Sequence, residues 1–162
     1  MSILAHIPRG KIKLLLICLM GCAPMCGRAQ IDKEKDAIKT VITKETSSFM
    51  NIDWKSWSSS WVQAPYAYWS YSDSTGSSFL EGWETINKTF ETYFNSQKPS
   101  KATITNDWVE VRVYGNGAYA HFIQKSVDEL DTEETSQIRV LEKKNGKWRV
   151  VCVSVVAKYP KK

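Results

Sequence analysis

The chain has 162 residues, a length that suits one domain of ordinary size. It contains 22 Lys+Arg and 17 Asp+Glu, but four of the basic residues (Arg9, Lys11, Lys13 and Arg28) lie near the N-terminus. Without that segment the chain is nearly neutral. This argues against nucleic-acid binding, which requires a concentrated basic face.

Residues 1–29 have the features of a secretory signal peptide. A basic start precedes a short apolar run, Leu14 to Met20, and small residues at Gly27 and Ala29 offer a cleavage site. The apolar run is too short to cross a bilayer as a helix, so we expect no transmembrane span. We therefore predict an exported chain, periplasmic or secreted, cleaved near Ala29 or Gln30.

Two further points depend on this segment. Leu19-Met20-Gly21-Cys22 is similar to a bacterial lipoprotein box, so lipidation of Cys22 is the alternative to simple cleavage. Cys18 and Cys26 also lie in or beside the segment, which leaves Cys152 alone in the remaining chain. A single cysteine cannot form an internal disulfide, so the domain, residues 31–162, must be held by its core.

Two helices are predicted first. Ile31 to Met50 has apolar residues at helical spacing, with Asp32 and Asp36 near its start, where carboxylates favour the helix dipole. One face of this helix carries, at helical spacing, Ile38, Val41, Ile42, Glu45 and Phe49, and charged residues surround the other face. Asp53 is a good N-cap for a second, short helix that carries Trp54, Trp57 and Trp61.

Pro65 ends this helical region, and the aromatic stretch Tyr66 to Ser72 is predicted to be a strand closed by a turn at 73–76. A third helix opens at 81–83, and Pro99 bars its continuation. Its buried stripe comprises Trp83, Ile86, Phe90 and Phe94.

Lys101 to Lys158 is predicted to form an antiparallel meander of four strands. Asn145-Gly146 is a strong hairpin signal, because both turn residues must accept positive φ. That turn sets Lys144 opposite Lys147, Leu141 opposite Val150 and Arg139 opposite Cys152. One face then carries Arg139, Leu141, Trp148, Val150, Cys152, Ser154 and Val156, and the other carries Ile138, Val140, Val151, Val153 and Val155.

The first hairpin of the meander is predicted to turn at Gly115-Asn116-Gly117. If Asn116-Gly117 forms its loop, Arg112 pairs with His121 and Val111 with Phe122. The core face then carries Val109, Val111, Val113, Ala120 and Phe122, and the mixed face carries Trp108, Glu110, Arg112, Tyr114, Tyr119, His121 and Ile123. A one-residue slip would exchange the two faces.

The predicted fold class is α+β, with three N-terminal helices packed on one side of a curved antiparallel sheet. This order resembles the nuclear-transport-factor-2-like (NTF2-like) superfamily, in its SnoaL-like and DUF4440-like bacterial branch. The residues that carry the resemblance are Asp53, Trp57, Gly82-Trp83-Glu84-Thr85-Ile86 and Asn145-Gly146-Lys147-Trp148-Arg149-Val150-Val151. The resemblance implies a cone around an apolar pocket, and frequently a homodimer formed through the sheet.

The resemblance leaves catalysis open, because the superfamily mixes enzymes with binding domains. The enzymes are similar in placing a carboxylate base inside the pocket. Asp53, Asp107 and Glu110 are the candidate acids, and His121 is the one histidine outside the leader. Bland roles as a helix cap, a strand-edge charge or an outer-face histidine compete with catalysis at each position.

Aromatic residues are the candidates for ligand binding: Trp54, Trp57, Trp61, Tyr68, Trp69 and Trp83. Aromatic stripes at helical spacing also serve as core, so packing competes with binding. The acidic loop at 128–134 fits no calcium motif, and we predict no metal and no cofactor. The sequence therefore predicts an exported domain that binds a small apolar or aromatic molecule, with a SnoaL- or ketosteroid-isomerase-like enzyme (isomerase, cyclase or dehydratase) as the alternative.

Overall fold

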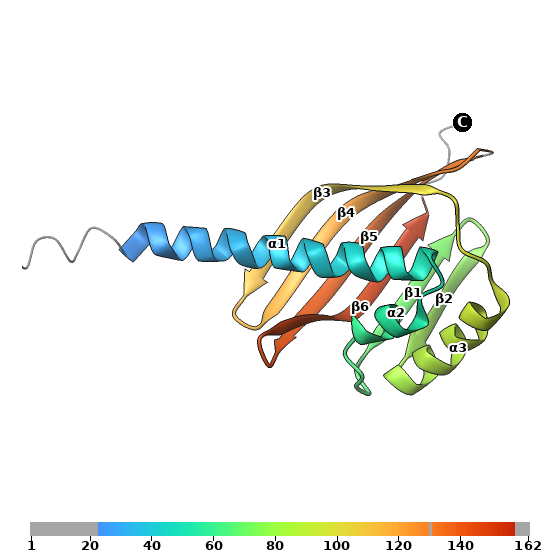
Figure 1. Ribbon diagram of the computed structural model, residues 1–162, viewed down its shortest axis with the longest axis horizontal. Coiled ribbons are helices and arrows are strands. Elements are labelled where there is room, and N and C mark those ends of the chain that lie inside the picture. The colour runs from blue at the N-terminus through green and yellow to red at the C-terminus, as the bar shows by residue number, and fades with distance from the viewer. Residues whose placement is uncertain (1–22, 130, 158–162) are drawn as a thin grey trace, which may run out of the picture. The chain divides into compact units, whose positions relative to one another are not determined.

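A computed structural model describes residues 23–129 and 131–157 (Figure 1). Most of the predicted signal peptide, including Cys22, therefore lies outside the described residues, as does the predicted end of the meander at Lys158. The chain divides into two compact units, one ending at Lys33 and one beginning at Glu34. The second unit contains the sheet and is described below by itself.

Three helices precede or interrupt the strands, as predicted. They are α1 (Ala23–Met50), α2 (Trp54–Ser59) and α3 (Trp83–Ser96). Asp53 caps α2, since its Oδ1 accepts from the Ser56 N–H at 3.0 Å. The predicted start of α1 at Ile31 is wrong: Pro24 falls in the first turn, where proline is tolerated, and nothing after it breaks the helix before Met50. Asp32 and Asp36 therefore lie inside the helix and not at its start.

Six strands form one sheet in the order β2-β1-β6-β5-β4-β3. Their bounds are β1 (Tyr68–Asp73), β2 (Gly76–Glu81), β3 (Thr103–Tyr114), β4 (Gly117–Val127), β5 (Thr132–Lys144) and β6 (Lys147–Ala157). The four-strand meander is confirmed. The prediction of a wholly antiparallel sheet is wrong, because β1 pairs with β6 in parallel. Strand β2 was also missed in the sequence analysis, since its Gly-Ser-Ser start has low strand propensity.

The β5–β6 hairpin has the predicted turn but not the predicted register throughout. Lys144 pairs with Lys147 and Leu141 with Val150, as expected, and Asn145 has φ 52°. A bulge then shifts the pairing, so Arg139 lies opposite Val153 and not opposite Cys152. Beyond the bulge the two faces of β6 exchange relative to the prediction: Val153 is buried against the helices, whereas Val156 is 46% exposed.

The β3–β4 hairpin departs from its prediction in two ways. Tyr114 pairs with Gly117, so the turn is Gly115-Asn116, and Gly115, with φ 61°, supplies the left-handed conformation that the turn needs. Arg112 consequently lies opposite Tyr119 and His121 opposite Glu110. A two-residue shift keeps the faces, but a bulge between Trp108 and Glu110 reverses them beyond that point.

The reversed faces have a direct consequence for packing. Val109 is 56% exposed, whereas the Trp108 ring lies 4.9 Å from that of Phe122, centroid to centroid. Val111, Ala120 and Phe122 keep their predicted place in the core. The opposite face of the sheet remains partly open, with Val140 38% exposed.

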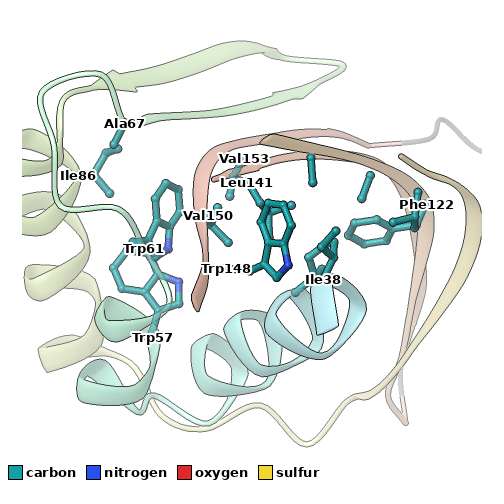
Figure 2. Close-up of a cluster of buried hydrophobic side chains, with 14 of the residues drawn as sticks. Ile38, Trp57, Trp61, Ala67, Ile86, Phe122, Leu141, Trp148, Val150 and Val153 are labelled. Atoms are coloured by element: carbon teal, nitrogen blue, oxygen red, sulfur yellow. The ribbon is translucent and has the colours of Figure 1, made fainter. Parts of the chain in front are cut away.

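The core lies between the helices and the sheet (Figure 2). Ile38 from α1 and Ile86 from α3 have no exposed surface, and the same cluster includes Phe122, Leu141 and Val150 from the strands. Burial of such aliphatic and aromatic side chains contributes about 1.5–3 kcal/mol each. The core therefore forms without a disulfide in the described residues, where Cys152 is free.

One polar contact fixes α1 against the closing hairpin. The two carboxylate oxygens of Glu34 accept from Lys143 Nζ at 2.6 Å and from Trp148 Nε1 at 2.7 Å. The indole of Trp148 is itself buried, so its N–H needs such a partner. Within the described residues, no helix is both long and apolar enough to cross a membrane.

Candidate functional site

A cavity of about 410 Å³ lies in the second unit, between the C-terminal end of α1, α2, α3 and the helix-facing side of the sheet. Its walls are mostly apolar. Six aromatic side chains line it: Phe49, Trp57, Trp69, Tyr71, Phe90 and Tyr93. Met50, Val153 and Val155 complete the apolar part, and the two valines reach it because the bulge in β6 turns them inward.

The aromatic rings are held against one another. The ring of Phe49 stacks on that of Tyr93 with centroids 5.2 Å apart, and it meets Phe90 edge-on at 5.8 Å. Trp69 meets Phe90 at 5.1 Å, also edge-on. Such contacts stabilise each pair beyond area burial alone, so they give the cavity a wall of fixed shape.

The part of the cavity lining that β4 and β5 supply is polar. Alternate residues of β5 (Glu133, Thr135, Gln137 and Arg139) line it, together with Gln124 and Ser126 of β4 and Glu45 and Thr46 of α1. Residues two apart on a strand share a face, so the run on β5 is a direct result of strand geometry. Gln124 lies opposite Thr135 in the ladder, which places the two glutamines diagonally across neighbouring strands.

A buried ion pair anchors this polar region. Arg139 Nη2 and Nε lie 3.3 and 3.4 Å from Glu45 Oε2, and the Trp57 Nε1–H donates to Glu45 Oε1 at 3.0 Å. Both partners are buried, with side chains 4% and 6% exposed. Because both carboxylate oxygens already accept hydrogen bonds, Glu45 mainly holds α1, α2 and β5 together.

The predicted catalytic residues do not meet at this cavity, and none of them lines it. Asp53 is the exposed cap of α2, and hydrogen bonds from the side chain and backbone of Ser56 lower its pKa. Asp107 is exposed. Glu110 pairs with the exposed Arg112 at 3.1 Å and raises the pKa of that guanidinium.

His121 lies on the opposite face of the sheet, where its Nε2 is 3.1 Å from Ser136 Oγ. This agrees with the outer position expected from the mixed face. Cys152 also lies off the core face. The pKa of its thiol is raised by burial, and the positive charge of Arg139 offsets only part of this effect. Within residues 23–129 and 131–157, His, Cys, Asp and Glu form no group of three or more that could hold a metal ion.

The predicted ligand-binding aromatics are divided between the cavity and the core. Trp57 and Trp69 line the cavity. Trp61 is fully buried beside Val150, whereas Trp54 and Trp83 pack on the ring of Trp57, at 5.4 and 6.0 Å. Tyr68 points to the other face of β1 and stacks on Phe79.

Sequence reasoning missed the polar residues of the cavity, although signals for two of them were present. Glu45 interrupts the apolar stripe of the first helix, and Arg139 lies on the core face of its strand. A charged residue is rarely buried without a partner, so two such anomalies on facing elements point to a buried pair. Nothing in the local pattern of 124–137 distinguishes its glutamines from solvent-exposed ones.

Comparison of the sequence with protein-family models and with curated proteins gives no match. Solved structures do match. An NTF2-like protein of unknown function from Shewanella oneidensis MR-1 has a TM-score of 0.60 at 14% identity, covering 75% of this chain and 97% of its own.

Two further solved structures carry a proposed activity. A proposed ketosteroid isomerase from Parabacteroides distasonis ATCC 8503 has a TM-score of 0.58 at 16% identity and covers 74% of this chain and 86% of its own. A proposed dehydratase of the NTF2-like family from Streptomyces avermitilis has a TM-score of 0.61 at 14% identity and covers 80% and 99%. At such identities the likeness defines the fold and not the activity. The α+β chain described here therefore has the NTF2-like fold.

Proposed function

We propose that this domain binds a small, largely apolar or aromatic molecule in the cavity between its helices and its sheet. The observation that carries the proposal is the cavity itself: about 410 Å³, walled by six aromatic side chains over a polar base. Sites for small molecules in proteins have this size range and this combination of apolar walls with a few polar groups.

A cavity-blocking variant with a matched control tests the proposal. Val155 lines the cavity, whereas its neighbour Val156 is 46% exposed on the opposite face of the same strand. Val155→Trp should fill the cavity and abolish binding. Val156→Trp adds the same side chain to the same strand and should leave binding intact.

Thermal denaturation in the presence of naphthalene, indole and biphenyl gives the readout. A ligand at a hundredfold excess over its Kd stabilises the native state by about 2.7 kcal/mol, which is easily measured. A rise in Tm for the wild type and for Val156→Trp, but not for Val155→Trp, supports the proposal. If no probe raises the Tm, or if both variants respond equally, the cavity is not the binding site.

An isomerase-, cyclase- or dehydratase-like enzyme is the second candidate, and the observation that favours it is the Glu45 carboxylate on the cavity wall. Two of the solved structures of similar fold carry such proposed activities. A general base must reach the proton it removes, and the hydrogen bonds from Trp57 and Arg139 compete with that role. Conversion of a β,γ-unsaturated ketone to its conjugated isomer, lost in Glu45→Gln, would establish the enzyme.

We further propose export and self-association. The basic start and short apolar run of residues 1–29 support export with cleavage near Ala29, and mass spectrometry of the mature N-terminus tests this against lipidation of Cys22. The partly exposed Val127 and Val140 on the outer sheet face support a homodimer. Light scattering measures its mass, and a monomer at all concentrations would refute it.

A further inference from the structure

The polar base of the cavity contains buried oxygens that lack a hydrogen-bond partner. Among the described residues, three of the five such side-chain atoms belong to residues that line this cavity: Thr46 Oγ1, Gln124 Oε1 and Gln137 Oε1. All three residues are more than nine-tenths buried. Leaving a buried acceptor without a donor is costly, and native proteins seldom do so without a reason.

The arrangement of the two glutamines bears on where their unpaired oxygens can find a hydrogen-bond donor. Gln137 Nε2 donates to Thr135 Oγ1 at 2.7 Å, which turns Oε1 away from that hydroxyl. Gln124 approaches from the neighbouring strand, diagonal to Gln137. The terminal amide torsion of glutamine is broad, so rotation about it can present an amide oxygen to a group in the cavity. Both oxygens accept hydrogen bonds and neither can donate.

The charges around the cavity act in the same direction. Among the described residues, Arg139 is the one cationic side chain that lines it, and the Glu45 carboxylate already neutralises Arg139. Glu133 adds a further carboxylate, so the described part of the lining carries an excess of negative charge. An anionic ligand would lose its hydration without gaining an unpaired cation.

We infer that the cavity takes an uncharged, planar molecule that carries at least one O–H or N–H donor, and that the donor is received by Gln124 and Gln137. The inference rests on the proposed binding function and specifies its ligand class. The aromatic walls accept the flat part of the molecule, and the two amide oxygens select its polar end. Anions of the same shape are discriminated against.

Four probes of one ring system test the inference on the full chain by calorimetry. They are naphthalene, 2-naphthol, 2-methoxynaphthalene and 2-naphthoate, which present no polar group, a donor, an acceptor alone and an anion. One net hydrogen bond corresponds to about fivefold to tenfold in affinity, so 2-naphthol should bind tighter than 2-methoxynaphthalene by that factor. 2-Naphthoate should bind most weakly.

Variants then assign the preference to residues. Gln137→Met and Gln124→Met keep a side chain of similar length, and each should reduce the preference for 2-naphthol. Gln63→Met is the control, since Gln63 is exposed and does not line the cavity. Thermal denaturation shows whether each variant is folded. If a variant is unfolded, the ranking of the four probes on the wild type still tests the inferred ligand class.

The outcomes separate the inference from the function on which it rests. If none of the probes binds, both fail. If all four bind with equal affinity, or if 2-methoxynaphthalene or 2-naphthoate binds most tightly, the binding function stands and the inferred ligand class is wrong. A preference for 2-naphthol that survives both glutamine substitutions would equally overturn the assignment to these residues.

Discussion

Replacing Arg139 with methionine should destabilise the domain by about 3–5 kcal/mol, the usual effect of removing one partner of a buried ion pair. The arginine is 4% exposed, and its guanidinium is the cationic partner of Glu45. Methionine keeps an unbranched apolar side chain beside the ring of Phe122, above which the guanidinium carbon lies at 5.5 Å. The loss would therefore come mainly from the carboxylate left behind, with Trp57 Nε1 at 3.0 Å as a remaining donor.

A double-mutant cycle isolates that cause. Glu45→Gln removes the charge and keeps an oxygen that can accept from Trp57. Combined with Arg139→Met, it should recover part of the lost stability, because no unpaired charge then remains buried. Groups in one network of this kind typically couple by about 0.5–3 kcal/mol, and we expect a value in the upper part of that range.

Urea denaturation followed by circular dichroism at neutral pH measures all four corners of the cycle. Equal m-values across the set would show that the variants unfold from comparable states. The reasoning is refuted if Arg139→Met costs less than about 1 kcal/mol. It is refuted equally if the double variant loses the full sum of the two single losses.

Gly82 has φ 78°, and a Cβ at this position would lie 3.4 Å from the Pro65 carbonyl oxygen, so Gly82→Ala should destabilise the domain by about 1–3 kcal/mol. Gly117→Ala, at a position where φ is not positive, is the control in the same urea experiment. The pKa of Asp53 is lowered from its ordinary value of 3.8, so at any pH above 3.8 the wild type should have a higher Tm than Asp53→Asn. That advantage should disappear as the pH falls through the folded-state pKa, and an advantage unchanged down to pH 2 would contradict it. Cys152, whose pKa burial raises, should react slowly with iodoacetamide at pH 8 until urea unfolds the chain, as peptide mass spectrometry of that one site would show; equal native and unfolded rates would contradict this.

The elements with strong local signals were predictable. Asp53 as a cap, Ile86, Phe90 and Phe94 as a buried stripe, and Asn145-Gly146 as a turn all follow from short-range chemistry, and the structure has each of them. These features need only the residues within one turn or one hairpin. They suffice to order the helices and the meander.

The features that were missed depend on distant partners. The bulges beside Trp108 and Val151 leave no mark in the alternation of apolar and polar residues, yet each reverses the faces of a strand. The short strand β2 exists because β1 offers it an edge. The polar base of the cavity likewise forms only when α1 meets β5, which no local window around Glu45 contains.

The parallel pairing of β1 with β6 bears on how the chain reaches its native state. Tyr68 is paired with Cys152, about half the chain away, and β6 is the last of the six described strands in the sequence. The β1–β2 hairpin therefore has no neighbour in the sheet until β6 has been synthesised, and closing so large a loop slows assembly. Until then Trp69 is not covered by Val153 and Val155 of β6. Nascent chains therefore expose an aromatic surface, and we expect them to aggregate unless they are kept apart from one another.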